Sequence, residues 1–239
     1  MVIEIDLLNH NMKHIIIGDL HGKDCWREIN IKNYDKVVFL GDYVDSFTIS
    51  DLAIYENLKN IIRLKKTNPH KVVLLLGNHD IQYLYFPRYQ CSGFRPTMQS
   101  QLTNLFNNNK GLFQIAYQKE NHIFSHAGIT NSWYNEFLRI PILETIKDGD
   151  DTIADLLNKV DQTGQRYILH TAGYFRGGDG NGGVTWADKK ETTMDMLKGH
   201  HQVVGHTVIK ELETIRYTDR SVTYIDVLDT VTYFHELDC

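Results

Sequence analysis

Chemically reactive side chains follow five short stretches of the sequence, and each stretch ends close to a glycine. The five motifs are Gly18-Asp19-Leu20-His21-Gly22, Gly41-Asp42-Tyr43-Val44-Asp45, Gly77-Asn78-His79-Asp80, His126-Ala127-Gly128 and Gly205-His206-Thr207. Carboxylate, amide and imidazole groups are ligands for ions such as Mn, Fe and Zn. Six or more of them exceed what one ion needs, whereas two ions sharing a bridging carboxylate would use them all. The motifs therefore predict a site for two divalent metal ions.

Each motif taken alone also has a plainer explanation. An Asp after a strand, such as Asp19, often caps the next helix, and Asn78 could hold a turn. A lone His126 or His206 is more often a structural histidine than a ligand. Capping alone does not account for five such motifs in succession, each after a predicted strand. The set as a whole favours metal ligands.

The elements that position these residues are short apolar runs at 14–17, 37–40 and 72–76. Such β-branched or leucine-rich runs, each ended by glycine, predict strands buried on both faces in a sheet covered by helices. Ser50 and Asp51 predict the start of a helix that continues to Leu64. With helices between the strands, the first third is predicted as βαβαβ. The polar residues then lie beyond the strand ends, where open α/β sheets bind ligands.

Beyond the first third, the pattern is more varied. Residues from about 83 to 110 are rich in aromatic side chains, proline and asparagine, and predict an irregular cap insertion with a helix over the pocket. We expect these further elements: a strand pair at 115–117 and 123–125, helices from Asn131 and from Asp151 or Thr152, a loop at 173–183, a strand at 202–204, and a terminal hairpin of 222–226 with 231–235. No linker interrupts the chain, so residues 1–239 are predicted to form a single domain.

Composition narrows the functional classes. The 239 residues are 42% hydrophobic and 23% charged, and 25 Lys and Arg against 30 Asp and Glu give a net charge of −5. This balance lacks the basic character of a protein that binds duplex nucleic acid. No apolar run has the length of a membrane span. The cysteines, Cys25, Cys91 and Cys239, form no disulfide framework and no zinc motif, which favours a cytoplasmic location.

The order of the five motifs resembles the calcineurin-like metallophosphoesterases, and within them the phosphoprotein phosphatase branch of serine/threonine phosphatases and diadenosine tetraphosphatases. The resemblance extends from residue 18 to about 207 and implies a four-layer α/β/β/α sandwich. It also implies two divalent ions bridged by Asp42, with Mn expected and Fe or Zn as alternatives. The ligands of the first ion would be Asp19 and His21, and those of the second Asn78, His126 and His206.

The same resemblance implies that His79 is the general acid and that Asp45 orients it. Two cations would lower the pKa of a shared water and neutralise phosphate oxygens, so that hydroxide attacks phosphorus in line. The departing oxygen needs a proton, and histidine titrates near neutrality. A carboxylate beside His79 favours its protonated form. The expected activity is hydrolysis of phosphomonoesters in a phosphoprotein or a nucleotide.

Four positions bear on the subclass. Ser46 and Phe47 replace the Arg-Gly pair that binds phosphate in the branch, and Asp80, in place of glutamate, is more frequent in phosphodiesterase relatives. Val208, by contrast, replaces the last histidine of the diesterase motif Gly-His-x-His. The alternatives are therefore a phosphodiesterase or dinucleoside polyphosphate hydrolase, or a non-catalytic metal- or phosphate-binding scaffold. His79 and Asp45 argue against the scaffold, because they serve the reaction.

Another arginine could replace the missing one. Arg88 and Arg95 lie in the aromatic insertion, and Arg176 lies in the glycine-rich loop. Arginine is the usual bidentate partner of phosphate. Of the three, we expect Arg95 and Arg176 to bind the phosphate, since they approach it from different segments.

Overall fold

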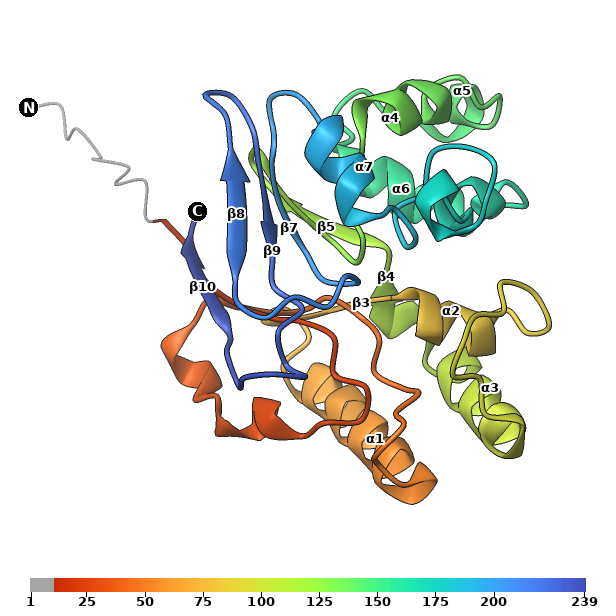
Figure 1. Cartoon of the computed structure of the whole chain (residues 1–239), viewed down its shortest axis with the longest axis vertical. Helices are drawn as coiled ribbons and strands as arrows, with labels where there is room; N and C mark the ends of the chain where they lie inside the picture. Colours follow the sequence, from red (N-terminus) through yellow and green to blue (C-terminus); the bar gives the residue numbers. More distant parts are fainter. Residues whose placement is uncertain (1–10) are drawn as a thin grey trace, which may run out of the picture.

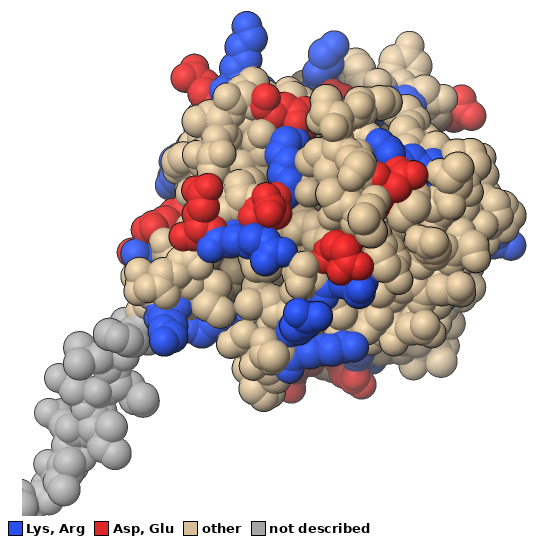
Figure 2. All heavy atoms as spheres, turned by 90° about the horizontal axis from the view of Figure 1, so that it is seen from below, with Lys and Arg blue, Asp and Glu red and all other residues tan. Residues whose placement is uncertain are grey.

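The computed structural model describes residues 11–239, which form two five-stranded sheets with helices on their outer sides (Figure 1). The strand order is β10-β1-β2-β3-β4 in the first sheet and β5-β6-β7-β9-β8 in the second. No helix among the described residues is both long and apolar enough to cross a membrane. On the face shown in Figure 2, acidic and basic side chains are interspersed.

The first sheet is built from the three apolar runs at the start of the sequence. Its strands are β1 (Lys13–Ile17), β2 (Lys36–Phe39), β3 (Val72–Leu75), β4 (Phe113–Gln114) and β10 (His235–Asp238). The first four are parallel to one another, and β10 is antiparallel to β1. Nearly every residue of β1, β2 and β3 is buried, as the continuous apolar runs predict.

The second sheet is mixed. Its strands are β5 (Ala116–Lys119), β6 (His122–Ser125), β7 (His201–Val204), β8 (Glu213–Arg216) and β9 (Ser221–Tyr224). The predicted strand pair is confirmed as the antiparallel pair of β5 and β6, and β7 lies parallel to both β6 and β9.

The predicted terminal hairpin is wrong. β9 pairs with β8, which precedes it, whereas β10 belongs to the other sheet and pairs with β1. The alternation at Val231 and Tyr233 was misleading, because both side chains are exposed. β10 covers the edge of β1 whose backbone groups would otherwise be unpaired, and Leu237 on β10 packs into the layer between the sheets.

Three of the α-helices begin at or next to the residues predicted to start them. The α-helices are α1 (Asp51–Thr67), α2 (Asn78–Leu84), α3 (Gln99–Asn107), α4 (Asn131–Phe137), α5 (Leu143–Ile146), α6 (Ile153–Asp161) and α7 (Lys189–Met194). The hydroxyls of Ser50, Thr130 and Thr152 accept backbone N–H bonds at the starts of α1, α4 and α6. Short 3-10 helices complete the chain: η1 (Cys25–Glu28), η2 (Ile31–Asn33), η3 (Pro96–Met98), η4 (Lys110–Leu112), η5 (Arg166–His170) and η6 (Tyr174–Arg176).

The first crossover differs from the prediction. An α-helix was expected between β1 and β2, but the chain forms only η1 and η2 there. The side chain of Asn30 accepts a bond from the N–H of Lys32 and starts a separate turn, which interrupts any longer helix. Trp26 fills the space by packing into the core and donating to Asn57 on α1.

Three apolar layers show how the sheets are stacked. Alternate residues of β1 face opposite sides, so Ile17 packs toward α1 and Ile16 packs toward the second sheet. The layer between the sheets joins Ile16 to Phe124 and Val203. A third cluster, which includes Tyr224, covers the other face of the second sheet beside α7. The predicted four-layer α/β/β/α sandwich is confirmed.

Candidate active site

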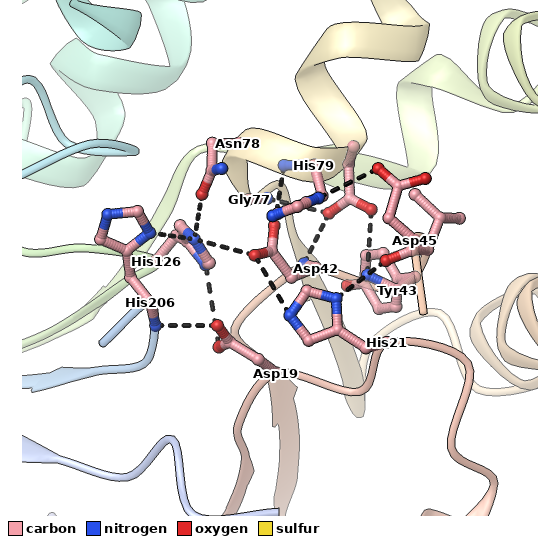
Figure 3. Close-up of polar contacts among 12 residues, drawn as sticks. Asp19, His21, Asp42, Tyr43, Asp45, Gly77, Asn78, His79, His126 and His206 are labelled. Carbon is pink, nitrogen blue, oxygen red and sulfur yellow. Dashed lines mark hydrogen bonds and ion pairs between the residues drawn. The ribbon is translucent and has the colours of Figure 1, made fainter. Parts of the chain in front are cut away.

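The five sequence motifs meet at one edge of the two sheets (Figure 3). Asp19 and Asp42 follow β1 and β2, and Asn78 begins α2 after β3. His126 and His206 follow β6 and β7 in the other sheet. The first sheet thus supplies mainly oxygen ligands and the second supplies imidazoles. The sandwich brings together residues that lie far apart in the sequence.

Unusual backbone geometry is concentrated in these turns. Among the described residues, six that are not glycine have positive φ, and four of them are His21 (46°), Asp42 (52°), Asp45 (62°) and His206 (66°). Such conformations cost free energy and persist where the surroundings hold them, often at functional sites. Gly77 is also required here, because a Cβ atom would lie 2.1 Å from Asp42 Oδ1.

One group of potential ligands is buried. His126 Nδ1 lies 3.0 Å from the Leu40 carbonyl oxygen, to which it can only donate, so Nε2 carries the free lone pair. This Nε2 lies 2.9 Å from Asn78 Oδ1, 3.1 Å from His206 Nδ1 and 3.5 Å from Asp42 Oδ2. Four ligand atoms from four turns therefore surround one small space.

A second group of potential ligands lies around His21, and His21 and His79 in this group line a cavity. His21 Nδ1 lies 2.9 Å from the Val44 carbonyl oxygen, which leaves Nε2 directed toward Asp42 Oδ2 at 3.8 Å. Asp19 Oδ2 accepts the backbone N–H of His206 at 2.9 Å, and its Oδ1 has no hydrogen-bond partner. His79 Nδ1 lies 3.0 Å from Asp45 Oδ2.

The donor set fits metal ions. Two clusters of three ligand-type residues share Asp42: one adds His21 and His79, and the other adds His126 and His206. Asp19 Oδ1 is buried without a hydrogen-bond partner, an arrangement that is costly in a protein unless a ligand binds it. Carboxylate oxygens with imidazole nitrogens suit Mn, Fe and Zn. His79 belongs to the first cluster by position, although the family resemblance assigns it to proton transfer.

Asp45 is held by more than His79. Gln82 donates its side-chain amide to the same Oδ2, and the Tyr83 hydroxyl donates to Oδ1 at 2.5 Å. Both follow His79 by three and four residues on α2, so they share its side of the helix. Sequence reasoning missed them, although this spacing was visible. The Asp45 carboxylate is thus held by contacts with three side chains.

A comparison with protein families decides the identity. The model of the calcineurin-like phosphoesterase family matches residues 12–210. The chain belongs to this family. It is therefore a phosphoric ester hydrolase, and its family relationship implies divalent metal ions and phosphorylated substrates.

Solved structures support the fold of this phosphoesterase. A mutant cold-active protein tyrosine phosphatase aligns with a TM-score of 0.55 at 14% identity, covering 91% of this chain and 71% of that one. A protein serine/threonine phosphatase from Saccharomyces cerevisiae, described as similar to human phosphatase PP5, gives 0.52 at 14% identity and covers 93% and 70%. A comparison with curated protein sequences gives no match.

The buried half of the phosphoesterase site combines an ionised carboxylate with neutral imidazoles. Burial disfavours the ionised form of Asp42, but His126, His79 and His21 outweigh it and hold its pKa at about 2. Burial lowers the pKa of His126, and burial together with His126 and Arg176 lowers that of His206. Neutral imidazoles are the form that binds metal.

His79 shows the opposite shift. Burial opposes its protonated form, but the charge of Asp42 and the bond to Asp45 raise its pKa to about 12. Protonated His79 is therefore the prevailing form at neutral pH in the protein without bound ligands. An imidazolium held by a carboxylate is suited to donate a proton.

Asp80 has a structural position. Its buried carboxylate accepts the backbone N–H groups of Asp42 at 2.7 Å, Tyr43 at 3.0 Å and Gly77 at 2.9 Å. Burial and the Asp42 charge raise its pKa, and these three donors oppose the rise. Asp80 therefore fixes the turn that carries Asp42.

A cavity of about 560 Å³ opens beside His21 and His79. The other residues lining it are Lys23, Asp45, Ser46, Phe47, Thr48, Ser92, Val208 and Asp229. Ser92 belongs to the predicted cap insertion, and Cys91 beside it lies 3.5 Å from Asn78 Nδ2. The cap insertion therefore borders both the cavity and a potential metal ligand.

The three predicted substrate arginines do not line this cavity. Arg95 binds the carboxylate of Asp51 and the carbonyl oxygen of Ser46. Arg176 lies near His206, but its Nε is 2.8 Å from Asp188 and its Nη2 donates to Thr207 at 2.8 Å. Arg88 is exposed on the cap insertion. Lys23, which sequence reasoning missed, is the basic residue that lines the cavity.

Proposed function

We propose that this phosphoesterase is a two-metal phosphatase that hydrolyses phosphomonoesters. The observation that carries the proposal is the His79–Asp45 pair, which lines the same cavity as His21 and lies next to Asp42. Asp19 and His21 would hold one ion, and Asn78, His126 and His206 the other, with Asp42 between them. Mn is the expected metal, with Fe or Zn as alternatives, because the donor set suits each of them.

The protein's own groups account for binding and proton transfer. Divalent ions bound here supply a water of lowered pKa and neutralise phosphate oxygens. His79 donates its proton from Nε2 to the departing oxygen of the substrate, because Nδ1 is engaged by Asp45. Gln82 and Tyr83 keep Asp45 in place during this transfer. The substrate is a phosphoprotein or a nucleotide.

One observation favours a phosphodiesterase as the second candidate: Ser46 occupies the cavity wall where the branch has an arginine. Asp80 adds no support for it, because the Asp80 carboxylate binds backbone groups and is absent from the cavity lining. A scaffold without activity would have no use for the Gln82 and Tyr83 bonds to Asp45. We therefore prefer the proposal that the protein hydrolyses phosphomonoesters.

Hydrolysis of nitrophenyl monoester and diester substrates tests the proposal. We expect activity toward the monoester that disappears after chelation and returns with Mn²⁺. Faster hydrolysis of the diester would favour the phosphodiesterase. If purified protein with bound Mn²⁺ hydrolyses neither substrate, and its His79→Asn variant behaves identically, the scaffold is supported.

A further inference from the structure

The proposed phosphatase site leaves one contact unassigned. A bound phosphomonoester carries up to two negative charges, and charge-assisted hydrogen bonds from Arg or Lys are the strong side-chain contacts to its oxygens. Ser46 cannot provide that charge. Arg95 is held by Asp51 outside the cavity, and Arg176, which lies near His206, pairs with Asp188 and does not line the cavity.

We propose that Lys23 binds the phosphate group of the substrate, in the role that the missing arginine would have. Lys23 is the only Lys or Arg among the described residues that line the cavity, and His21, His79 and Ser46 line the same cavity. The inference rests on the proposed function for the identity of the substrate. It concerns a residue that the five motifs do not include.

The backbone places Lys23 firmly beside the metal ligands. It follows His21 by two residues, and Gly22 between them has φ of 85°, which turns the chain sharply. The N–H of Gly22 donates to the Tyr43 carbonyl at 2.9 Å, and the N–H of Lys23 donates to that of Leu20 at 2.9 Å. The carbonyl of Lys23 accepts from Asn57 Nδ2 at 2.8 Å. One rigid turn therefore presents both His21 and Lys23.

A carboxylate holds the ammonium group at the cavity wall. Lys23 Nζ lies 2.6 Å from Asp229 Oδ1, and Asp229 lines the cavity too. The Lys23 and Asp229 side chains are 26% and 51% exposed, so the pair is open to solvent and to ligands. An ammonium group has three donors, and Asp229 uses one. Two donors remain for phosphate oxygens.

Lysine would bind phosphate with a different geometry from arginine. Its ammonium group is a compact charge on a flexible stem, whereas the arginine fork fixes two oxygens in a plane. Lys23 can therefore follow the phosphate group through the reaction with little demand on its orientation. Removing this charge should weaken phosphate binding roughly tenfold or more, as expected for a charge-assisted hydrogen bond.

The test compares four variants of the full chain loaded with Mn²⁺. Lys23→Met removes the charge, Lys23→Arg keeps it, and Asp229→Asn removes the partner. Lys189→Met is the matched control, because Lys189 is 25% exposed and pairs with Glu213 outside the cavity. Three quantities are measured: the affinity for inorganic phosphate by calorimetry, and kcat and KM on nitrophenyl phosphate.

We expect Lys23→Met to weaken phosphate affinity and raise KM at least tenfold, with Mn²⁺ content unchanged. Lys23→Arg should recover most of the loss, Lys189→Met should match the wild type, and Asp229→Asn should bind phosphate at least as tightly. Phosphate affinity of Lys23→Met within twofold of wild type would overturn the inference. An equal loss in Asp229→Asn would also overturn it, because the ion pair would then be structural.

Calorimetry separates this inference from the proposed function. If the wild type binds phosphate through Lys23 but hydrolyses no monoester, the phosphatase proposal fails and the Lys23 site stands. If the wild type hydrolyses monoesters and Lys23→Met is indistinguishable from it, only the Lys23 inference fails.

Discussion

The two halves of the site differ in their access to the cavity. In the buried half, Asn78 and His126 are almost fully enclosed, and a backbone carbonyl fixes the His126 ring. In the open half, the His21 and His79 side chains are 21% and 16% exposed and line the cavity. Asp42 belongs to both halves. The buried half is suited to permanent binding of an ion, and the open half to exchange, substrate binding and proton transfer.

The largest effect is expected where the halves meet. Asp42→Asn replaces the shared carboxylate and should reduce kcat/KM by more than about 100-fold, because even outer partners of metal ligands cost roughly 10- to 100-fold. The metal content of the purified variant should fall by more than one ion. Unchanged metal content, measured by mass spectrometry, would show that Asp42 does not bridge.

Only the open half should supply the proton that the leaving group needs. His79→Asn should lower kcat by roughly 100- to 10,000-fold on a substrate with a poor leaving group while metal stays bound. The loss should be much smaller on nitrophenyl phosphate, whose leaving group needs less protonation. Rates on a series of leaving groups check this. An equal loss across the series would assign His79 to another task.

A smaller effect is expected at Tyr83, which contacts Asp45 in the open half. Tyr83→Phe removes one of the bonds that hold Asp45, and should lower kcat about tenfold with KM unchanged, since a hydrogen bond to a charged group is being lost. Tyr224→Phe is the control: Tyr224 is equally buried, but its hydroxyl bonds to Thr192 and Thr193 on α7. If both variants lose the same activity, Tyr83 has no specific role toward Asp45.

The smallest expected effect separates the halves by pH. Without metal, burial lowers the pKa of His126 in the folded protein. Below about pH 6.5, His126 is therefore protonated more readily in the unfolded chain than in the folded one, and the free energy of unfolding falls as the pH falls. Although burial opposes it, Asp42 raises the pKa of His79 to about 12, so the stability it contributes is complete below about pH 6.5 and declines above it.

Urea unfolding of the chelated protein at pH 5, 7 and 9 checks these opposite slopes. His126→Asn should reduce the loss of unfolding free energy between pH 7 and pH 5, and His79→Asn should reduce the loss between pH 7 and pH 9. Each change should be on the order of 1 kcal/mol. The same slope change in both variants would remove the electrostatic distinction between the halves.

The parallel strands of the first sheet were more predictable than its antiparallel strand β10. Runs such as 37–40 are apolar throughout and end in a glycine, so the strand and the place of Asp42 follow directly from the sequence. β10 was missed because its partner, β1, lies more than 200 residues away, and strand alternation carries no information about which edge a strand joins.

The site itself divides in the same way. Asp19, Asp42, Asn78, His126 and His206 lie after strands, and the sandwich gathers them as the family resemblance implies. Lys23 and Tyr83 were not chosen from the sequence, because residue spacing alone does not show which cavity or carboxylate a side chain reaches. Arg95 fitted the chemistry of phosphate binding, but it pairs with Asp51 at the start of α1 and does not line the cavity.

The most direct test of the central claim is a titration of chelated wild-type protein with Mn²⁺, followed by electron paramagnetic resonance. The account predicts two ions per chain, with the open-half ion the weaker, and a spin-coupled signal from ions that share Asp42. The coupled signal should appear together with phosphatase activity. A single ion per chain at saturation, with full activity toward phosphomonoesters, would contradict the two-metal account.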